Sequence, residues 1–77
     1  MKEKLIKILN TVVPGINIEA ETGLVDDGIL DSLALINIIE QISMEFNILI
    51  PFDELDSIDF NSVENMMEMI KKYQART

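Results

Sequence analysis

The chain has 77 residues, of which 14 are acidic and 6 basic, and it contains no histidine and no cysteine. These absences exclude Ser-His-Asp and Cys-His catalysis and zinc sites built on those ligands, and the net charge of −8 disfavours binding to nucleic acid. We therefore expect one non-enzymatic domain over residues 1–77, without a metal site or a transmembrane segment. The lack of cysteine and of a signal-peptide pattern suits a cytoplasmic protein, and we expect it to be a monomer.

Residues 2–13 are predicted to form a first helix that ends at Pro14-Gly15. Its apolar residues recur at the spacing of one helical face: Leu5, Ile8, Leu9 and Val12. Residues 14–30 follow without a sustained period, but they contain too many apolar residues for a disordered linker. We expect an ordered loop whose hydrophobic side chains pack against the helices, and ordered loops of this length are often functional.

Residues 32–46 are predicted to form a second helix with two distinct faces. The core face comprises Leu35, Ile38, Ile39, Ile42 and Phe46, and the opposite face Leu33, Asn37, Glu40, Gln41 and Met44. A solvated face is usually polar, so the large apolar side chains of Leu33 and Met44 need an explanation. Either they contact a partner or they pack beneath the neighbouring loop.

Residues 47–51 are expected to be an apolar connector, because a single short strand would have no partner. A short third helix is predicted over residues 53–59, held by Leu55 and Ile58. The last helix should start near Asn61, since Asn61 and Glu64 have the spacing of a capping box. Its inward face would comprise Val63, Met66, Met67 and Ile70. The expected fold is an all-α four-helix bundle of three main helices and one short helix, with a long first loop.

The junction between loop and second helix, residues 27–33, is the candidate functional segment. Asp31 or Ser32 fits a helix cap, although no Glu or Gln completes a capping box. The start of a helix also presents free N–H groups and the positive end of the dipole, which favour a phosphate ester. An exposed serine there is well placed for phospho-modification. The residues alone leave both interpretations open.

Asp31-Ser32-Leu33 resembles the Asp-Ser-Leu signature of acyl and peptidyl carrier proteins, which opens their second helix after a long loop. Gly28, the segment 46–51 (Phe-Asn-Ile-Leu-Ile-Pro) and a capped last helix extend the resemblance over nearly the whole chain. The resemblance implies an acyl-carrier-like fold. It also implies that a phosphopantetheinyl transferase attaches 4′-phosphopantetheine from coenzyme A covalently to Ser32, with Asp31 as the flanking acid that orients the serine or its partner.

The resemblance further implies a carrier that supplies no chemistry of its own. It would present thioester-linked acyl or aminoacyl cargo to a loading ligase or acyltransferase and to a downstream synthase or transferase. Its partners would contact the second helix at Leu33, Ile36, Asn37, Glu40 and Met44. Fatty-acid carriers usually have acids where this chain has Ala34 and Asn37, so the pattern is more similar to D-alanyl and stand-alone peptidyl carriers.

A second class of function is also consistent with the residues. An acidic helical adaptor would dock partners through the same helix, with Ser32 only a helix cap or a phosphorylation site. The two hypotheses differ at Ser32, because a carrier without this hydroxyl would lose all activity. An adaptor would lose only capping energy, about 1 kcal/mol.

Overall fold

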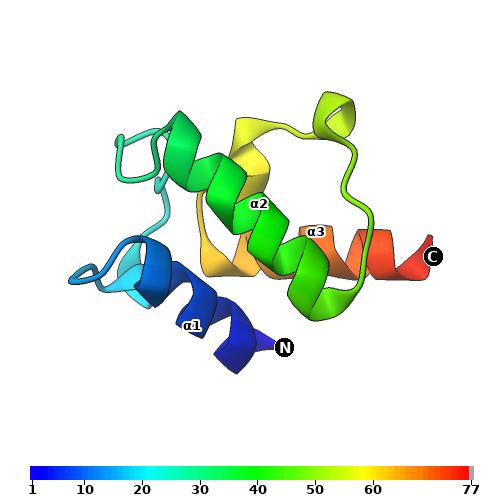
Figure 1. Ribbon diagram of the computed structural model, residues 1–77. Helices are drawn as coiled ribbons and strands as arrows, with labels where there is room; N and C mark the ends of the chain where they lie inside the picture. The colour runs from blue at the N-terminus through cyan, green and yellow to red at the C-terminus, as the bar shows by residue number, and fades with distance from the viewer. Residues whose placement is uncertain (77) are drawn as a thin grey trace.

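The computed structural model describes residues 1–76 and contains three α-helices: α1 (Lys2–Val12), α2 (Ser32–Phe46) and α3 (Val63–Ala75). Three short 3₁₀ helices lie in the connections: η1 (Ile18–Ala20), η2 (Phe52–Glu54) and η3 (Ser57–Phe60). Figure 1 shows α2 running diagonally across the molecule, and α1 packs against both α2 and α3. No strand occurs in residues 1–76, which confirms the prediction of an all-α fold.

The two ends of α2 lie where the sequence predicts them, because each carries a local signal. At the start, Asp31 has an extended backbone and its Oδ1 accepts a hydrogen bond from the Ala34 N–H at 2.8 Å. At the end, Asn47 has a φ of 51° and Ile48 donates its N–H to the Ser43 carbonyl at 3.1 Å. Asparagine is one of the few residues other than glycine that tolerates this left-handed conformation. The helix therefore ends at Phe46.

The core collects side chains from all three α-helices and from both long connections. The buried residues are Leu5, Ile8 and Leu9 of α1, Ile38, Ile39 and Ile42 of α2, and Val63, Met66, Met69, Ile70 and Tyr73 of α3. The loop over residues 13–30 adds Ile18, Leu24 and Leu30, which confirms that this loop is ordered by its apolar residues. Ile48 and Ile50 anchor the second connection in the same way.

Four residues predicted to face the core are buried only in part. They are Val12 of α1, Leu35 and Phe46 of α2, and Met67 of α3, which pack against the core but keep some contact with solvent. In α3, Met69 is buried and Met67 is not. The buried face runs through Met66, Met69, Ile70 and Tyr73, and Met67 lies at its edge. The helical period is thus correct, and the error concerns only which side chains lie at the edge of the buried stripe.

The single short helix expected over residues 53–59 is instead two separate 3₁₀ helices, η2 and η3. Leu55 and Asp56 between them have extended backbone conformations. Asp56 caps η3, since Asp56 Oδ1 accepts from the Ile58 N–H at 3.3 Å and Asp59 Oδ2 accepts from the Asp56 N–H at 3.2 Å. A capping residue is non-helical, so the chain cannot run through Asp56 as one helix. Ile58 is exposed rather than buried as an anchor.

The start of α3 differs from the prediction in its cap. Ser62 is the N-cap, and its Oγ accepts from the Asn65 N–H at 3.1 Å. Asn61 has the helical backbone angles of the last turn of η3, with a φ of −75° and a ψ of −21°. The predicted capping box of Asn61 and Glu64 is therefore wrong, and the Asn61 side chain is free to bond elsewhere.

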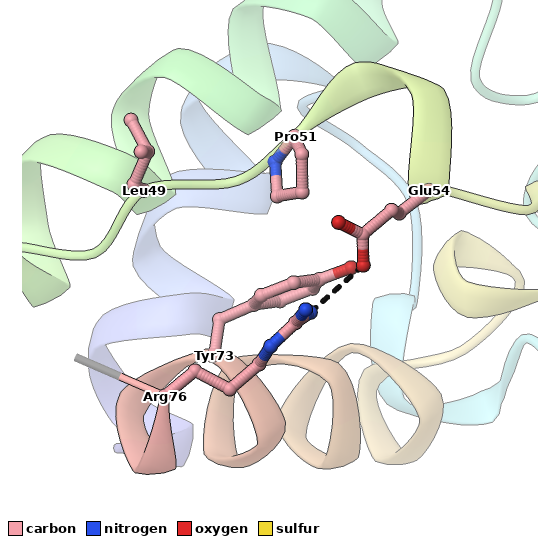
Figure 2. A pocket seen from close by; sticks show the side chains of 5 residues that line it. All are labelled: Leu49, Pro51, Glu54, Tyr73 and Arg76. Carbon is pink, nitrogen blue, oxygen red and sulfur yellow. Dashed lines mark hydrogen bonds and ion pairs between the residues drawn. The ribbon is translucent and has the colours of Figure 1, made fainter.

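The connector after α2 is tied to the C-terminal turn of α3 by Arg76. Figure 2 shows the Arg76 side chain beside Glu54 and Tyr73. Arg76 Nη1 lies 2.8 Å from Glu54 Oε1, and the guanidinium carbon lies 5.3 Å from the centroid of the Tyr73 ring. The hydrogen bond and the charge of Glu54 raise the pKa of Arg76. Together with Leu49 and Pro51, these residues line a cavity of about 410 Å³.

Candidate functional site

Ser32 is the first residue of α2, and its side chain is exposed. Asp31 is the N-cap, so the interpretation of Ser32 as the cap is wrong. The hydroxyl of Ser32 therefore does not cap the start of the helix. The first N–H groups of a helix have no acceptor within it, and those of Ser32 and Leu33 lie beside this hydroxyl. The first turn of α2 contains no acidic residue. A phosphate ester at Ser32 would therefore meet free donors and the positive end of the helix dipole.

The backbone that leads into Ser32 is fixed by a compact series of turns. Gly28 donates its N–H to the Val25 carbonyl at 3.0 Å, and Leu30 donates its N–H to the Leu24 carbonyl at 2.9 Å. Gly28 has a φ of 77°, a conformation in which a side chain is strained. Leu24 and Leu30 are both buried. The loop is therefore anchored in the core two residues before Ser32.

Asn61 joins this loop to the start of α3. Its Oδ1 accepts from the N–H groups of Val25 at 2.9 Å and Asp26 at 3.1 Å, and its Nδ2 donates to Asp26 Oδ2 at 3.1 Å. The Asn61 carbonyl also accepts from the Leu24 N–H at 2.9 Å. With 5% exposure, Asn61 is buried. Sequence reasoning missed this role because the side-chain partners lie 35 or 36 residues earlier, and no local pattern indicates them.

The outer face of α2 leaves all five residues predicted to bind partners exposed to solvent: Leu33, Ile36, Asn37, Glu40 and Met44. The exposed fractions of the apolar side chains are 80% for Leu33, 46% for Ile36 and 76% for Met44. Leu33 and Met44 thus do not pack beneath the neighbouring loop, and that explanation of their position is wrong. Because the five residues recur at helical spacing, they form one continuous stripe, which we call the α2 outer face.

A small cavity lies beside the first turns of α2. Its volume is about 210 Å³, and its lining residues are Leu35, Ile39, Phe52, Leu55, Asp56, Ser57 and Phe60. Leu35 is three residues after Ser32, so about one helical turn separates the serine from this mostly apolar surface. The larger cavity at Arg76 is lined by none of the predicted site residues.

Residues 1–76 contain neither a cluster of metal ligands nor a helix suited to spanning a membrane. No group of three or more Asp or Glu side chains in residues 1–76 is arranged to hold a metal ion. Within these residues, none of the helices combines the length and the apolar character needed to cross a bilayer. What the structure does bring together at the start of α2 is an exposed hydroxyl, free backbone donors and an apolar cavity.

Residues 2–70 match the family model described as the phosphopantetheine attachment site, PP-binding. The chain belongs to the PP-binding family. Members of the PP-binding family carry a covalently attached 4′-phosphopantetheine group. The match includes the loop, all of α2 and the first part of α3, so the carrier-family resemblance of the sequence is confirmed.

A D-alanyl carrier protein of Leuconostoc mesenteroides subsp. mesenteroides is similar to this PP-binding chain. The two are 25% identical over 72 residues, which cover 92% of each protein. No solved structure matches the chain. The similarity over nearly the full length of both proteins supports a role as a phosphopantetheine carrier.

Proposed function

We propose that this protein is a carrier whose 4′-phosphopantetheine arm is attached to Ser32 and holds acyl or aminoacyl cargo as a thioester. The observation that carries the proposal is the division of roles at the start of α2. Asp31 caps the helix, and the exposed hydroxyl of Ser32 remains available. In this proposal residues 1–77 form one carrier domain that acts in the cytoplasm and has no catalytic residues of its own.

Attachment consists of one transfer reaction. The Ser32 hydroxyl oxygen attacks the pyrophosphate of coenzyme A, adenosine 3′,5′-bisphosphate leaves, and the transferase takes the hydroxyl proton. The N–H groups of Ser32 and Leu33 and the α2 dipole would stabilise the negative charge of the resulting phosphodiester. Leu35, Ile39 and the other residues of the small cavity would offer an apolar surface to the arm. Once bound, the arm supplies the thiol on which cargo is carried.

The proposal is tested by incubating the chain with coenzyme A and a broad-specificity phosphopantetheinyl transferase. Intact mass should increase by one phosphopantetheine, and fragmentation should place this increment on Ser32. Ser43 is an internal control on the same helix, because its hydroxyl is bonded to the Ile39 carbonyl at 2.9 Å. A folded chain without an increment, or with the increment on another serine, would contradict the proposal.

Among cargo classes, we favour a single amino acid over a fatty acyl chain. The relative in Leuconostoc is named as a D-alanyl carrier. In addition, Ala34 and Asn37 stand where fatty-acid carriers usually have acids, and the acids of α2 are limited to Glu40 and Glu45. The loading enzyme of this proposal is accordingly an amino-acid-activating ligase, followed by a transferase that receives the aminoacyl group.

Partner enzymes are proposed to dock on the α2 outer face mainly through apolar contacts. Leu33 and Met44 are largely exposed there, and the face has a single acid, Glu40. Salt screens charge pairs and leaves apolar contacts intact, so we expect the transferase KM for the carrier to change little with ionic strength. A strong rise of KM with added salt would instead indicate recognition by charge.

Leu33→Asp is expected to raise the KM of the transferase for the carrier by about tenfold, because loss of one well-buried interface contact costs more than about 1 kcal/mol and tenfold corresponds to about 1.4 kcal/mol. Leu49→Asp is the matched control. Leu49 is 86% exposed, but it lies in the connector after α2, and the substitution adds the same charge. Steady-state kinetics of both variants give the comparison. Equal effects of the two substitutions would rule out the α2 outer face as the docking surface.

A further inference from the structure

The buried side chain of Asn61 is hydrogen-bonded to the loop that precedes Ser32. The amide of Asn61 uses both of its ends, since Oδ1 accepts from the Val25 and Asp26 N–H groups while Nδ2 donates to the Asp26 carboxylate. The main-chain carbonyl of Asn61 adds a fourth hydrogen bond, from the Leu24 N–H. One residue at the junction of η3 and α3 thus holds three consecutive residues of a loop that is distant in sequence.

Residues 24–26, which are hydrogen-bonded to Asn61, are connected to Ser32 by a short and constrained stretch of backbone. Leu30 donates its N–H back to the Leu24 carbonyl at 2.9 Å, so the far end of the loop is bonded to a residue that Asn61 holds. Leu30 is itself buried, and Asp31 and Ser32 follow it directly. A movement of residues 24–26 away from Asn61 would therefore shift the backbone that begins α2.

Two N–H groups of the loop depend on the same side-chain oxygen as their acceptor. The N–H groups of Val25 and Asp26 are part-buried and share the single acceptor Asn61 Oδ1. A buried donor that loses its acceptor must either remain unsatisfied or move to reach water. Loss of the Asn61 amide would thus favour loop conformations that open towards solvent.

We propose that Asn61 is a positioning residue for phosphopantetheine attachment, because its clamp on residues 24–26 holds Ser32 in the orientation that the transferase recognises. The proposal rests on attachment at Ser32 as proposed above. Asn61 acts through the loop. If only a fraction of the molecules has the correct loop, the apparent affinity of the transferase falls to that fraction of its full value. The effect should therefore lie in KM more than in kcat.

The direction of the hydrogen bond between the Asn61 and Asp26 side chains can be reversed by substitution. Asn61→Asp keeps an acceptor for the two loop N–H groups, but it places a carboxylate against the Asp26 carboxylate. Asp26→Asn, added to this variant, supplies an amide donor to the new carboxylate and restores the pair in the opposite direction. A rescue by the double variant is specific to the hydrogen bond, since a loss of packing would not be repaired by it.

Phosphopantetheine incorporation at varied carrier concentration separates KM from kcat for each variant. Asn61→Asp is expected to raise KM about tenfold with kcat changed less than about twofold, and the double variant should return KM to within about threefold of wild type. Asn65→Ala is the matched control. Asn65 is also near the start of α3, but its side chain donates to the Ile58 carbonyl at 2.9 Å and not to the loop. Its KM should equal that of wild type.

Amide hydrogen exchange of the unmodified proteins provides a readout that does not depend on the transferase. The Val25 and Asp26 N–H groups should exchange faster in Asn61→Asp and return towards wild-type protection in the double variant. Circular dichroism identifies any variant that does not fold. If Asn61→Asp does not fold, Asp26→Ala replaces it, because Asp26 is exposed and this change removes only the bond to Asn61 Nδ2. A KM about threefold above wild type is then expected.

The possible results separate this inference from the proposed function. If wild type is modified at Ser32 and the folded Asn61→Asp variant has an unchanged KM, the role of Asn61 is overturned and the carrier function stands. A raised KM without rescue by Asp26→Asn also overturns it. If folded wild type takes up no phosphopantetheine at all, the carrier function fails, and the positioning role fails with it.

Discussion

Replacing Ser32 with alanine will abolish phosphopantetheine attachment and leave the chain folded. Attachment requires a hydroxyl oxygen as the nucleophile, and alanine has none. The side chain of Ser32 is exposed and makes no capping bond, because Asp31 caps α2. The free energy of unfolding should therefore change by less than about 0.5 kcal/mol. Intact mass after incubation with coenzyme A and transferase measures the loss, and urea denaturation measures the stability.

Asp31→Ala is the matched control for this result. It removes the carboxylate that accepts from the Ala34 N–H at 2.8 Å, so it should lower the free energy of unfolding by about 1 kcal/mol. The two substitutions thus distinguish the side chain that caps α2 from the neighbouring side chain whose hydroxyl is proposed to be modified. Attachment retained in Ser32→Ala would mean that another residue carries the arm and would contradict the proposed site. No attachment in folded wild type, together with a loss of stability in Ser32→Ala, would favour the adaptor hypothesis.

Replacing Leu24 with alanine will remove much of the stability of the whole domain. Leu24 lies in the loop between α1 and α2, yet its side chain is 0% exposed. Truncation of a fully buried leucine costs about 2–5 kcal/mol, because transfer energy is lost and a cavity remains. A domain of this length has a total stability of only about 4–12 kcal/mol. Urea denaturation should therefore show a large decrease in the midpoint.

Leu33→Ala removes the same atoms from a leucine that is 80% exposed. Its free energy of unfolding should differ from that of wild type by less than about 0.5 kcal/mol. The contrast tests whether the long loop is part of the core or only lies on it. Equal losses in Leu24→Ala and Leu33→Ala would mean that the loop does not pack as the structure shows.

The sequence was sufficient for features that depend on neighbouring residues. The bounds of α2 were predicted correctly because Asp31 before the helix and Asn47 after it have local conformational preferences. The apolar residues of the 14–30 segment correctly predicted an ordered loop, because disordered segments contain few apolar side chains and these gain free energy only when they are buried. The segment of the candidate site was found in the same way, from the position of Ser32 at a helix start and from the carrier-family resemblance of Asp31-Ser32-Leu33.

Features that depend on distant partners could not be predicted. The local spacing of Asn61 and Glu64 indicated a capping box, but Asn61 bonds to a loop 35 residues away and Ser62 takes the cap. The error over residues 53–59 is of a different kind, because the break at Asp56 rests on its reciprocal capping with Asp59, a local signal that the prediction of one helix did not use. Whether Leu33 and Met44 were covered depended on the path of the loop, which periodicity does not describe.

The separation of the two faces of α2 has a consequence for the evolution of this protein. Ile38, Ile39 and Ile42 are buried in the core, whereas the outer face contributes nothing to it. Substitutions on the outer face therefore change stability little. With partner enzymes docked on that face as proposed above, one copy could acquire new partners after a gene duplication through mutations there alone. Its folding and Ser32, the proposed attachment site, would be inherited unchanged.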